Sequence, residues 1–401
     1  MNTYTLMNKN TELLDVTMER GFPTAITNIR KDKTHLLPVF MFSKDMRNPN
    51  IVFFGMWWRS RQIPASRVNI NDILHYLTGK VICTDELAEK SFGLSLSDHY
   101  WLRISPEITW EQVNFFTNTF SEDIGDLVLD GKVKPAYDFM SPDNTSDGII
   151  PKRWKIIQDK RVLIKGSFSG VVLQPQPFRE VFASRVANIL LNSKQDDFLK
   201  AVNYSVGIID DRAFSYCENF VTTETEYVPF HQIVNSDGFF RIEGQSSFEF
   251  VESFYKADKF QFMLHGMLLL DYIVLNQDRH FGNFGLIRCV DTGEFLYPAP
   301  IFDTGNSVFY NSNKLRVHDL YSKPFSESFE EQLNLINIQD FSEELKMLEP
   351  QLHDIFWDSF KNSFEQESLF AEWCYFRKTR RRTAFHVQFW GSQLPKSSEN
   401  Q

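Results

Sequence analysis

An apolar segment that runs directly into a cluster of polar side chains is the most constraining feature of this 401-residue chain. From Asp258 to Val274 the apolar residues fall nearly all around a helix, which is typical of a helix buried within a domain. The segment is shorter than the ~20 apolar residues that a bilayer requires, so it predicts no membrane span. The loop that follows, Asn276–Gly285, holds two Asn, one Asp, one Arg and one His in its first eight positions. Because loops that leave buried helices often carry function, we expect the site there.

A second acidic loop, Ile301–Asn306, places Asp303 after a short apolar strand and before a glycine. Phosphoryl transfer needs a carboxylate to orient the attacking hydroxyl, and it needs Mg²⁺ held by Asp and Asn oxygens. Protein kinases place the catalytic Asp five residues before the metal-binding Asn, and Asp278 and Asn283 have this spacing. Asp303 follows Asn283 by 20 positions, which predicts a longer hairpin between them than common protein kinases have.

The other half of a phosphotransferase site is predicted further upstream. Lys165 ends a predicted strand at 161–165, and Glu180 lies in a predicted helix at 178–191. A strand Lys and a helix Glu are how kinases hold the α and β phosphates of ATP. The turn-rich segment Thr145–Gly148 could cover the phosphates through its backbone N–H groups. Each feature is common alone, and their order along the chain is the stronger argument.

These residues resemble one family. Asn276–Asn283 is similar to the N-x-D-R-H-x-x-N loop of HipA-like Ser/Thr kinases, and Thr145–Lys152 is similar to their S-x-x-G-x-Q-P-K nucleotide loop. Leu163–Lys165 matches the family's I-x-K, and Arg179–Glu180 matches its N-E except that Arg179 replaces the Asn. The resemblance spans residues 140–390 and is best for the stand-alone proteins of Firmicutes and the CtkA type.

The resemblance implies ATP and Mg²⁺ as cofactors, a protein substrate with a Ser or Thr acceptor, and a small antitoxin-like partner in a toxin–antitoxin module. It also implies a role for each matched position. Asp278 would be the catalytic base, Asn283 and Asp303 the Mg²⁺ ligands, Lys165 the ligand of ATP phosphate and Glu180 its holder, with Thr145, Ser146 and Gly148 in the nucleotide loop. Because the family's autophosphorylated Ser aligns with Thr145, either Thr145 or Ser146 is the expected autophosphorylation site.

The expected fold class is α+β, with a bilobal, protein-kinase-like architecture. The expected organisation is an accessory α+β region at 1–125, a small, mostly antiparallel β lobe with one key helix at 126–250, and a helical lobe at 251–401. Further expected elements are β-like runs at 39–42 and 51–54; helices at 71–77, 110–120 and 329–386; and sheet strands at 154–157, 161–165, 206–209, 213–221 and 226–230.

The net charge of −10 disfavours bulk binding to nucleic acid or anionic membranes. The N-terminus has no signal-like apolar run, and the four cysteines are far apart, so we expect a cytoplasmic protein, with delivery into a host only if it is CtkA-like. The basic run 377–382 is expected to be a solvated helix face. Asp271 is expected to be a buried carboxylate that accepts backbone N–H groups of the loop, and His280 a hydrogen-bonded scaffold packed under it.

Two other functions stay open at this point. Phosphoinositide and small-molecule kinases also use an Asp-Arg-His-x-x-Asn loop, but they carry a basic loop after the metal-binding Asp, whereas residues 306–313 are neutral here. A catalytically inactive pseudokinase scaffold is the second alternative. All five expected catalytic positions carry the required residue types, which argues against it.

Overall fold

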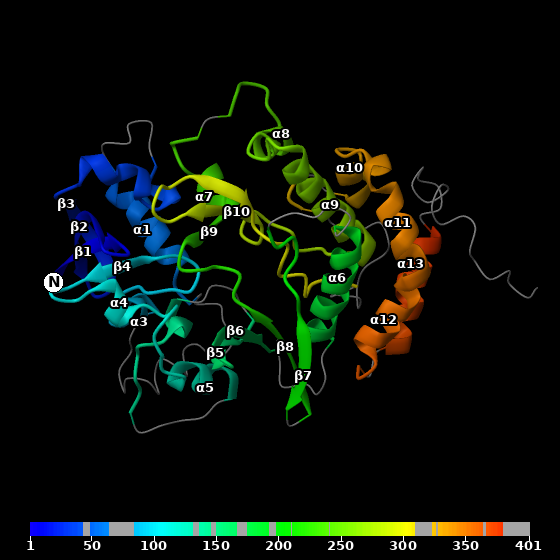
Figure 1. The fold of residues 1–401 in the computed structure, drawn as a ribbon, viewed down its shortest axis with the longest axis horizontal. Helices are drawn as coiled ribbons and strands as arrows, with labels where there is room; N and C mark the ends of the chain where they lie inside the picture. Colours follow the sequence, from blue (N-terminus) through cyan, green and yellow to red (C-terminus); the bar gives the residue numbers. More distant parts are fainter. Residues whose placement is uncertain are drawn as a thin grey trace, which may run out of the picture. The chain divides into compact units, whose positions relative to one another are not determined.

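The computed structural model combines short antiparallel sheets with helices, which confirms the expected α+β class (Figure 1). The structure describes residues 1–42, 49–63, 84–130, 136–145, 150–166, 175–191, 198–209, 211–239, 241–308, 323–325, 328–363 and 366–379. The expected helix at 71–77, Ser146, Gly148 and residues 380–382 lie outside these ranges. None of the described helices is both long and apolar enough to cross a membrane.

The chain divides into two units, each assembled from segments that are separated in the sequence. The first unit contains residues 1–171, 207–245 and 284–299, and the second contains 172–206, 246–283 and 300–401. The boundaries expected after residues 125 and 250 stay a prediction.

The first unit begins with a four-stranded antiparallel sheet of order β3-β2-β1-β4. Its strands are β1 (Asn2–Asn8), β2 (Thr11–Glu19), β3 (Phe22–Thr27) and β4 (Tyr100–Arg103). Buried side chains of β1 and β2, among them Leu6, Leu14 and Val16, form a core with Trp57 and Trp58.

The apolar runs at 39–42 and 51–54 form helices, so the prediction that they are β-like is wrong. Val39–Met41 forms the 3₁₀ helix η2 and Ile51–Ser60 forms α1. The Asn50 side chain accepts a hydrogen bond from the Val52 N–H and thereby caps α1. Burial of the helix face that carries Trp57 and Trp58 outweighs the β propensity of the run at 51–54.

The expected helix at 110–120 is much shorter than predicted. Helix α4 spans only Trp110–Val113, because Asn114 has extended backbone angles and ends it. The Asn114 side-chain amide donates to the Trp110 carbonyl and accepts from the Thr117 N–H, which supplies local partners in place of further helical turns.

The second sheet of this unit has the order β5-β6-β8-β7 and contains Lys165. Its strands are β5 (Lys152–Ile157), β6 (Lys160–Lys165), β7 (Ser205–Ile209) and β8 (Arg212–Glu218). The β5–β6 hairpin turns at Gln158 and Asp159, which both have positive φ, as a two-residue type I′ turn requires. The strands expected at 154–157 and 161–165 are confirmed, although the strand expected at 213–221 ends at Glu218.

The third sheet contains the hairpin expected between Asn283 and Asp303. Its order is β11-β10-β9, with β9 at Thr225–Pro229, β10 at Gly285–Cys289 and β11 at Phe295–Pro298. The strand expected at 226–230 therefore exists, but it pairs with β10 and not with the sheet of Lys165.

The buried Arg288 on β10 connects this hairpin to residues 35–37 near the N-terminus. Its guanidinium donates to the carbonyl oxygens of His35 at 2.7 Å and Leu37 at 3.1 Å, and it lies 3.0 Å from the Glu226 carboxylate. Arg288 and Glu226 are 1% and 2% exposed, so the pair lies inside a core that the N-terminal segment helps to build.

The remaining short helices of the first unit are η1 (Lys31–Leu36), α3 (Thr84–Lys90), α5 (Asp123–Asp130), η3 (Pro142–Thr145) and α7 (Phe230–Val234).

The described elements of the second unit are mainly helical, as expected for the C-terminal part of the chain. They are α6 (Gln176–Leu190), α8 (Ser247–Glu252), α9 (Asp258–Val274), α10 (Phe329–Leu333), η5 (Ile338–Phe341), α11 (Ser342–Leu348), η6 (Glu349–Gln351), α12 (Leu352–Phe360) and α13 (Gln366–Thr379). The rings of Phe182, Phe356 and Trp373 pack together, with distances between ring centroids of 5.2 to 5.4 Å. Helix α9 is buried over most of its length, as predicted.

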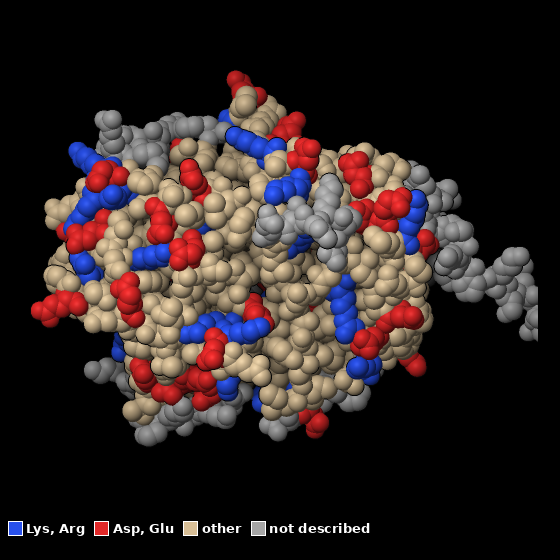
Figure 2. Space-filling view, in the orientation of Figure 1, with Lys and Arg blue, Asp and Glu red and all other residues tan. Residues whose placement is uncertain are grey.

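Acidic and basic side chains are interspersed over the face seen in Figure 2, where the coloured residues show no broad basic area. This distribution agrees with the net charge of −10.

Candidate functional site

The loop with the densest polar cluster starts where α9 ends. Leu275 caps the helix in the left-handed conformation, with φ 57° and ψ 48°, and is buried. A left-handed conformation costs a side-chain-bearing residue about 1–2 kcal/mol, and such strain is concentrated at functional sites. The turn sends Asn276–Asn283 away from the helix axis, and the loop then folds back against α9.

A buried ion pair fixes this loop to α9. The Arg279 guanidinium donates from Nε to Asp271 Oδ2 at 2.8 Å and from Nη2 to Asp271 Oδ1 at 2.9 Å. Asn276 Nδ2 donates to the same carboxylate at 2.9 Å. Asp271 is thus a buried structural carboxylate, as expected, but its donors among the described residues are side chains and not the backbone N–H groups that we predicted.

The same guanidinium joins the two predicted loops. Arg279 Nη1 donates to the carbonyl oxygens of Asn283 and Phe302, each at 3.0 Å. These two oxygens therefore lie within twice that distance of each other. Because Phe302 precedes Asp303, one buried nitrogen brings the backbones at both predicted metal ligands together.

Asn283 closes the first loop on Asp278. Its Nδ2 donates to the Asp278 carbonyl oxygen at 2.8 Å, and its Oδ1 accepts from the His280 N–H at 3.0 Å. His280 is exposed, so the expectation that it packs under the loop is wrong. Its ring does support the loop by hydrogen bonding, since Nδ1 accepts from the Gly282 N–H at 3.0 Å.

Asp303 lies in a strained loop that is anchored on the segment after α6. Its φ is 58°, and its N–H lies 3.4 Å from the hydroxyl oxygen of Tyr204. Just before it, Ile301 forms an isolated parallel bridge with Ala201. Ser184 of α6 contacts the same segment, because its hydroxyl donates to the Val202 carbonyl oxygen at 2.9 Å.

Glu180 of α6 is buried beside this second loop. A Cβ atom built on Gly305 would lie 3.4 Å from Glu180 Cγ and 3.6 Å from Oε1. Glu180 is 2% exposed. The structure therefore places the carboxylate of this predicted site residue against the Asp303–Gly305 turn.

Asn306 is a polar contact of this site that the sequence analysis did not single out. Its Nδ2 donates to Asp278 Oδ2 at 2.8 Å, and its carbonyl oxygen accepts from the Gln277 N–H at 3.3 Å. The other oxygen of Asp278 lies 4.0 Å from Lys323 Nζ. The only signal in the sequence is the position of Asn306 directly after the glycine of the Asp303 loop.

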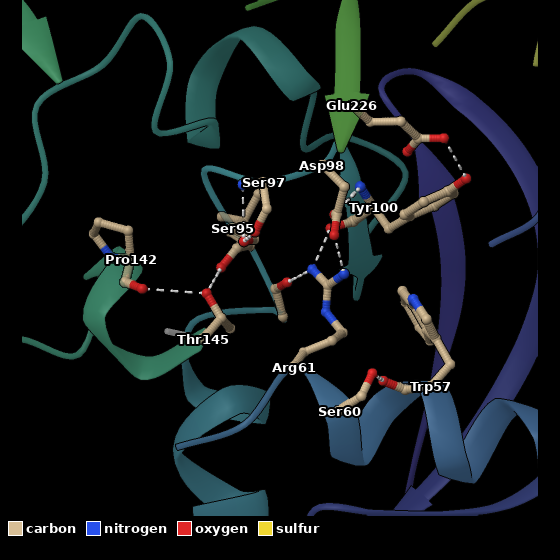
Figure 3. Close-up of polar contacts among 12 residues, drawn as sticks. Trp57, Ser60, Arg61, Ser95, Ser97, Asp98, Tyr100, Pro142, Thr145 and Glu226 are labelled. Atoms are coloured by element: carbon tan, nitrogen blue, oxygen red, sulfur yellow. Dashed lines mark hydrogen bonds and ion pairs between the residues drawn. The ribbon is translucent and has the colours of Figure 1, made fainter. Parts of the chain in front are cut away.

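The predicted phosphate-binding residues lie in the first unit. Lys165 is 5% exposed at the end of β6, where it pairs with Lys152 on β5 and Ser215 on β8. Thr145 ends η3, and its buried hydroxyl lies 2.7 Å from the Leu94 carbonyl oxygen and 3.3 Å from that of Pro142. Figure 3 shows the Thr145 side chain between Pro142 and the loop that carries Ser95.

The oxygen donors of the two loops fit a hard divalent cation. Asn283 offers an amide oxygen that keeps one lone pair beyond its bond from His280, and Asp303 offers a carboxylate. Within the described ranges no three His, Cys, Asp or Glu side chains form a metal-binding group. A cation held by Asn283 and Asp303 would therefore take its remaining ligands from phosphate and water, which is usual for Mg²⁺.

The comparisons with known proteins find similarity among solved structures. No protein-family model matches the chain, and no curated protein matches it. Among solved structures it is similar to the crystal structure of the Helicobacter pylori proinflammatory kinase CtkA, with a TM-score of 0.43 and 18% sequence identity. The match covers 61% of this chain and 95% of that one. The case for a function therefore rests on the residues of the two loops themselves.

Proposed function

We propose that this chain is an ATP- and Mg²⁺-dependent phosphotransferase of the HipA-like type that modifies Ser or Thr of a protein substrate. Asp278 accepts the proton of the attacking hydroxyl. Asn283 and Asp303 would hold Mg²⁺, whose positive charge would stabilise the negative charge on the transferred phosphoryl group. Lys165 and Glu180 keep the roles that the family resemblance implies.

One observation carries the proposal. Arg279 bonds to the carbonyl oxygens of Asn283 and Phe302, so a buried scaffold brings together the loops that contain all three expected catalytic residues. Asp278 itself stays partly exposed, with 41% of its side chain accessible, as a group that must meet a substrate requires. A purely structural carboxylate would be expected to resemble Asp271, which is 1% exposed.

The test is transfer of labelled phosphate from ATP to a protein extract by the wild type and by Asp278→Ala. We expect the variant to lose about 10²–10⁴-fold in rate, the usual contribution of a positioned general base. Asp354→Ala is the matched control, because Asp354 is a carboxylate on α12 in the same unit with 88% of its side chain exposed. Equal transfer by Asp278→Ala and the wild type would reject catalysis through Asp278.

The same assay addresses the alternatives. Label in a lipid extract instead of the protein extract would favour a phosphoinositide or small-molecule kinase. ATP binding without transfer to either extract would favour a pseudokinase scaffold.

Autophosphorylation in the nucleotide loop is part of the proposal, with Thr145 and Ser146 as the two sites. The Thr145 hydroxyl is buried against Leu94, so a phosphate cannot be added to it while η3 holds this conformation. We therefore expect peptide mapping after incubation with ATP to find phosphate on Ser146 before Thr145. Phosphate on neither residue would remove this part of the proposal.

A further inference from the structure

Asn306 contacts the proposed catalytic base, Asp278, although its side chain is unfavourable for the stability of the fold. Its Nδ2 donates to Asp278 Oδ2 at 2.8 Å. Its Oδ1 is buried and has no hydrogen-bond partner among the residues that the structure describes. Leaving a buried acceptor unpaired costs about 1–3 kcal/mol, so an amide placed there for folding alone would be unfavourable.

The NH₂ group of the amide explains why an Asn is suited to position 306. An Asp at this position would set a second carboxylate against Asp278, and an apolar residue would leave Oδ2 without its donor. A hydrogen bond to one oxygen selects a single rotamer of the Asp278 carboxylate. The second oxygen, Oδ1, is then left for the acceptor hydroxyl, with the Lys323 ammonium group 4.0 Å away.

The backbone around Asn306 makes this contact a link between the two loops. The Gln277 N–H donates to the Asn306 carbonyl oxygen at 3.3 Å, one residue before Asp278. Two residues further along, the Val308 N–H donates to the Val274 carbonyl oxygen at 2.9 Å at the end of α9. Asn306 is thus held from both sides while its side chain reaches Asp278.

We propose that Asn306 is a positioning residue for phosphoryl transfer: it orients the Asp278 carboxylate toward the acceptor hydroxyl through the Nδ2–Oδ2 hydrogen bond. This inference rests on the proposed function, because it needs Asp278 to be the base. It adds a residue from the Asp303 loop whose role is orientation and not metal binding.

The first experiment compares steady-state transfer by the wild type, Asn306→Leu and Asn306→Gln. Hydrogen bonds to charged groups are worth about 1.5–3 kcal/mol, so we expect Asn306→Leu to lower kcat about 10–100-fold without changing the KM for ATP. Asn306→Gln keeps an amide donor and should recover part of the loss. A rise in KM with unchanged kcat, or no recovery by Asn306→Gln, would overturn the positioning role.

The second experiment asks whether Asn306 acts through Asp278. In the Asp278→Ala background, Asn306→Leu should cause no further loss of transfer, since the group that it orients is gone. An additional loss of similar size would show that Asn306 acts independently and would overturn the proposal. If Asn306→Leu does not fold, Asn306→Ala takes its place, because it removes the donor without setting a second carboxylate beside Asp278.

Asn337→Ala is the matched control for both experiments. Asn337 donates from Nδ2 to the Asp340 carboxylate at 2.9 Å, the same kind of bond at an exposed site of the same unit. It should transfer phosphate as the wild type does. An active wild type with an equally active Asn306→Leu would reject the positioning role and leave the proposed function standing, whereas an inactive wild type would reject both.

Discussion

Replacing Arg279 by Lys tests the buried scaffold of the site most directly. The guanidinium makes four hydrogen bonds that the structure resolves, two to the Asp271 carboxylate and one each to the carbonyl oxygens of Asn283 and Phe302. A single ammonium group keeps the charge but cannot reach both the carboxylate and the two carbonyls. At least two buried acceptors would then lose their donor.

The magnitude follows from those lost partners. An unsatisfied buried group costs about 1–3 kcal/mol, and breaking a buried pair costs about 3–5 kcal/mol, so Arg279→Lys should lower the free energy of unfolding by about 2–5 kcal/mol. That is a large share of the ~5–15 kcal/mol that stabilises an ordinary protein. Guanidinium chloride denaturation of the full chain measures it, with the midpoint expected at lower denaturant concentration.

The control is Arg185→Lys in the same unit. Arg185 pairs with Asp358, and their side chains are 42% and 53% exposed, so that substitution should cost less than about 1 kcal/mol. If Arg279→Lys destabilises the chain no more than Arg185→Lys does, the buried clamp does not hold the two loops and the reasoning fails.

Three further predictions concern residues of the first unit. Gly285→Ala should destabilise the fold by more than about 3 kcal/mol, because the new Cβ would lie 2.1 Å from the Val228 carbonyl oxygen, whereas Gly305→Ala meets only ordinary contacts; thermal melting compares the two. Burial raises the pKa of Glu226 to about 7, above its ordinary value of 4.5, despite the nearby Arg288. Because the unfolded chain binds fewer protons than the folded chain between these values, stability should fall as the pH rises from about 4.5 to about 7, and Glu226→Gln should flatten the curve measured by denaturation at each pH. Thr145→Val should cost about 1–3 kcal/mol, since the Leu94 carbonyl loses its buried donor; an unchanged denaturation midpoint would contradict this.

Local sequence patterns predicted the helices and strands whose structure depends little on residues distant in the sequence. Helix α9 is apolar nearly all round, so its burial could be inferred without knowledge of its neighbours. The β5–β6 hairpin was readable from two strand-like runs around a short polar turn. The run at 51–54 has β-favouring residues, yet it is helical because the Asn50 cap and the burial of Trp57 decide its structure.

The candidate site was predictable in its residue types but not in its contacts. The spacing of Asp278, Asn283 and Asp303 marked the loops, whereas nothing local indicated that Arg279 bonds to both. Asn306 was missed because a polar residue after a glycine is ordinary in any turn. Its significance comes from a hydrogen bond across 28 positions of sequence, which periodicity and spacing do not report.

The contacts of Arg288 limit where the chain can be truncated. Its guanidinium donates to the carbonyl oxygens of His35 and Leu37, so a fragment that begins after residue 125 would bury this cation without those two acceptors. A shortened chain should therefore keep the strands β1, β2 and β3 and the η1 segment that carries His35. We therefore expect removal of the first hundred residues to destabilise the hairpin that follows Asn283.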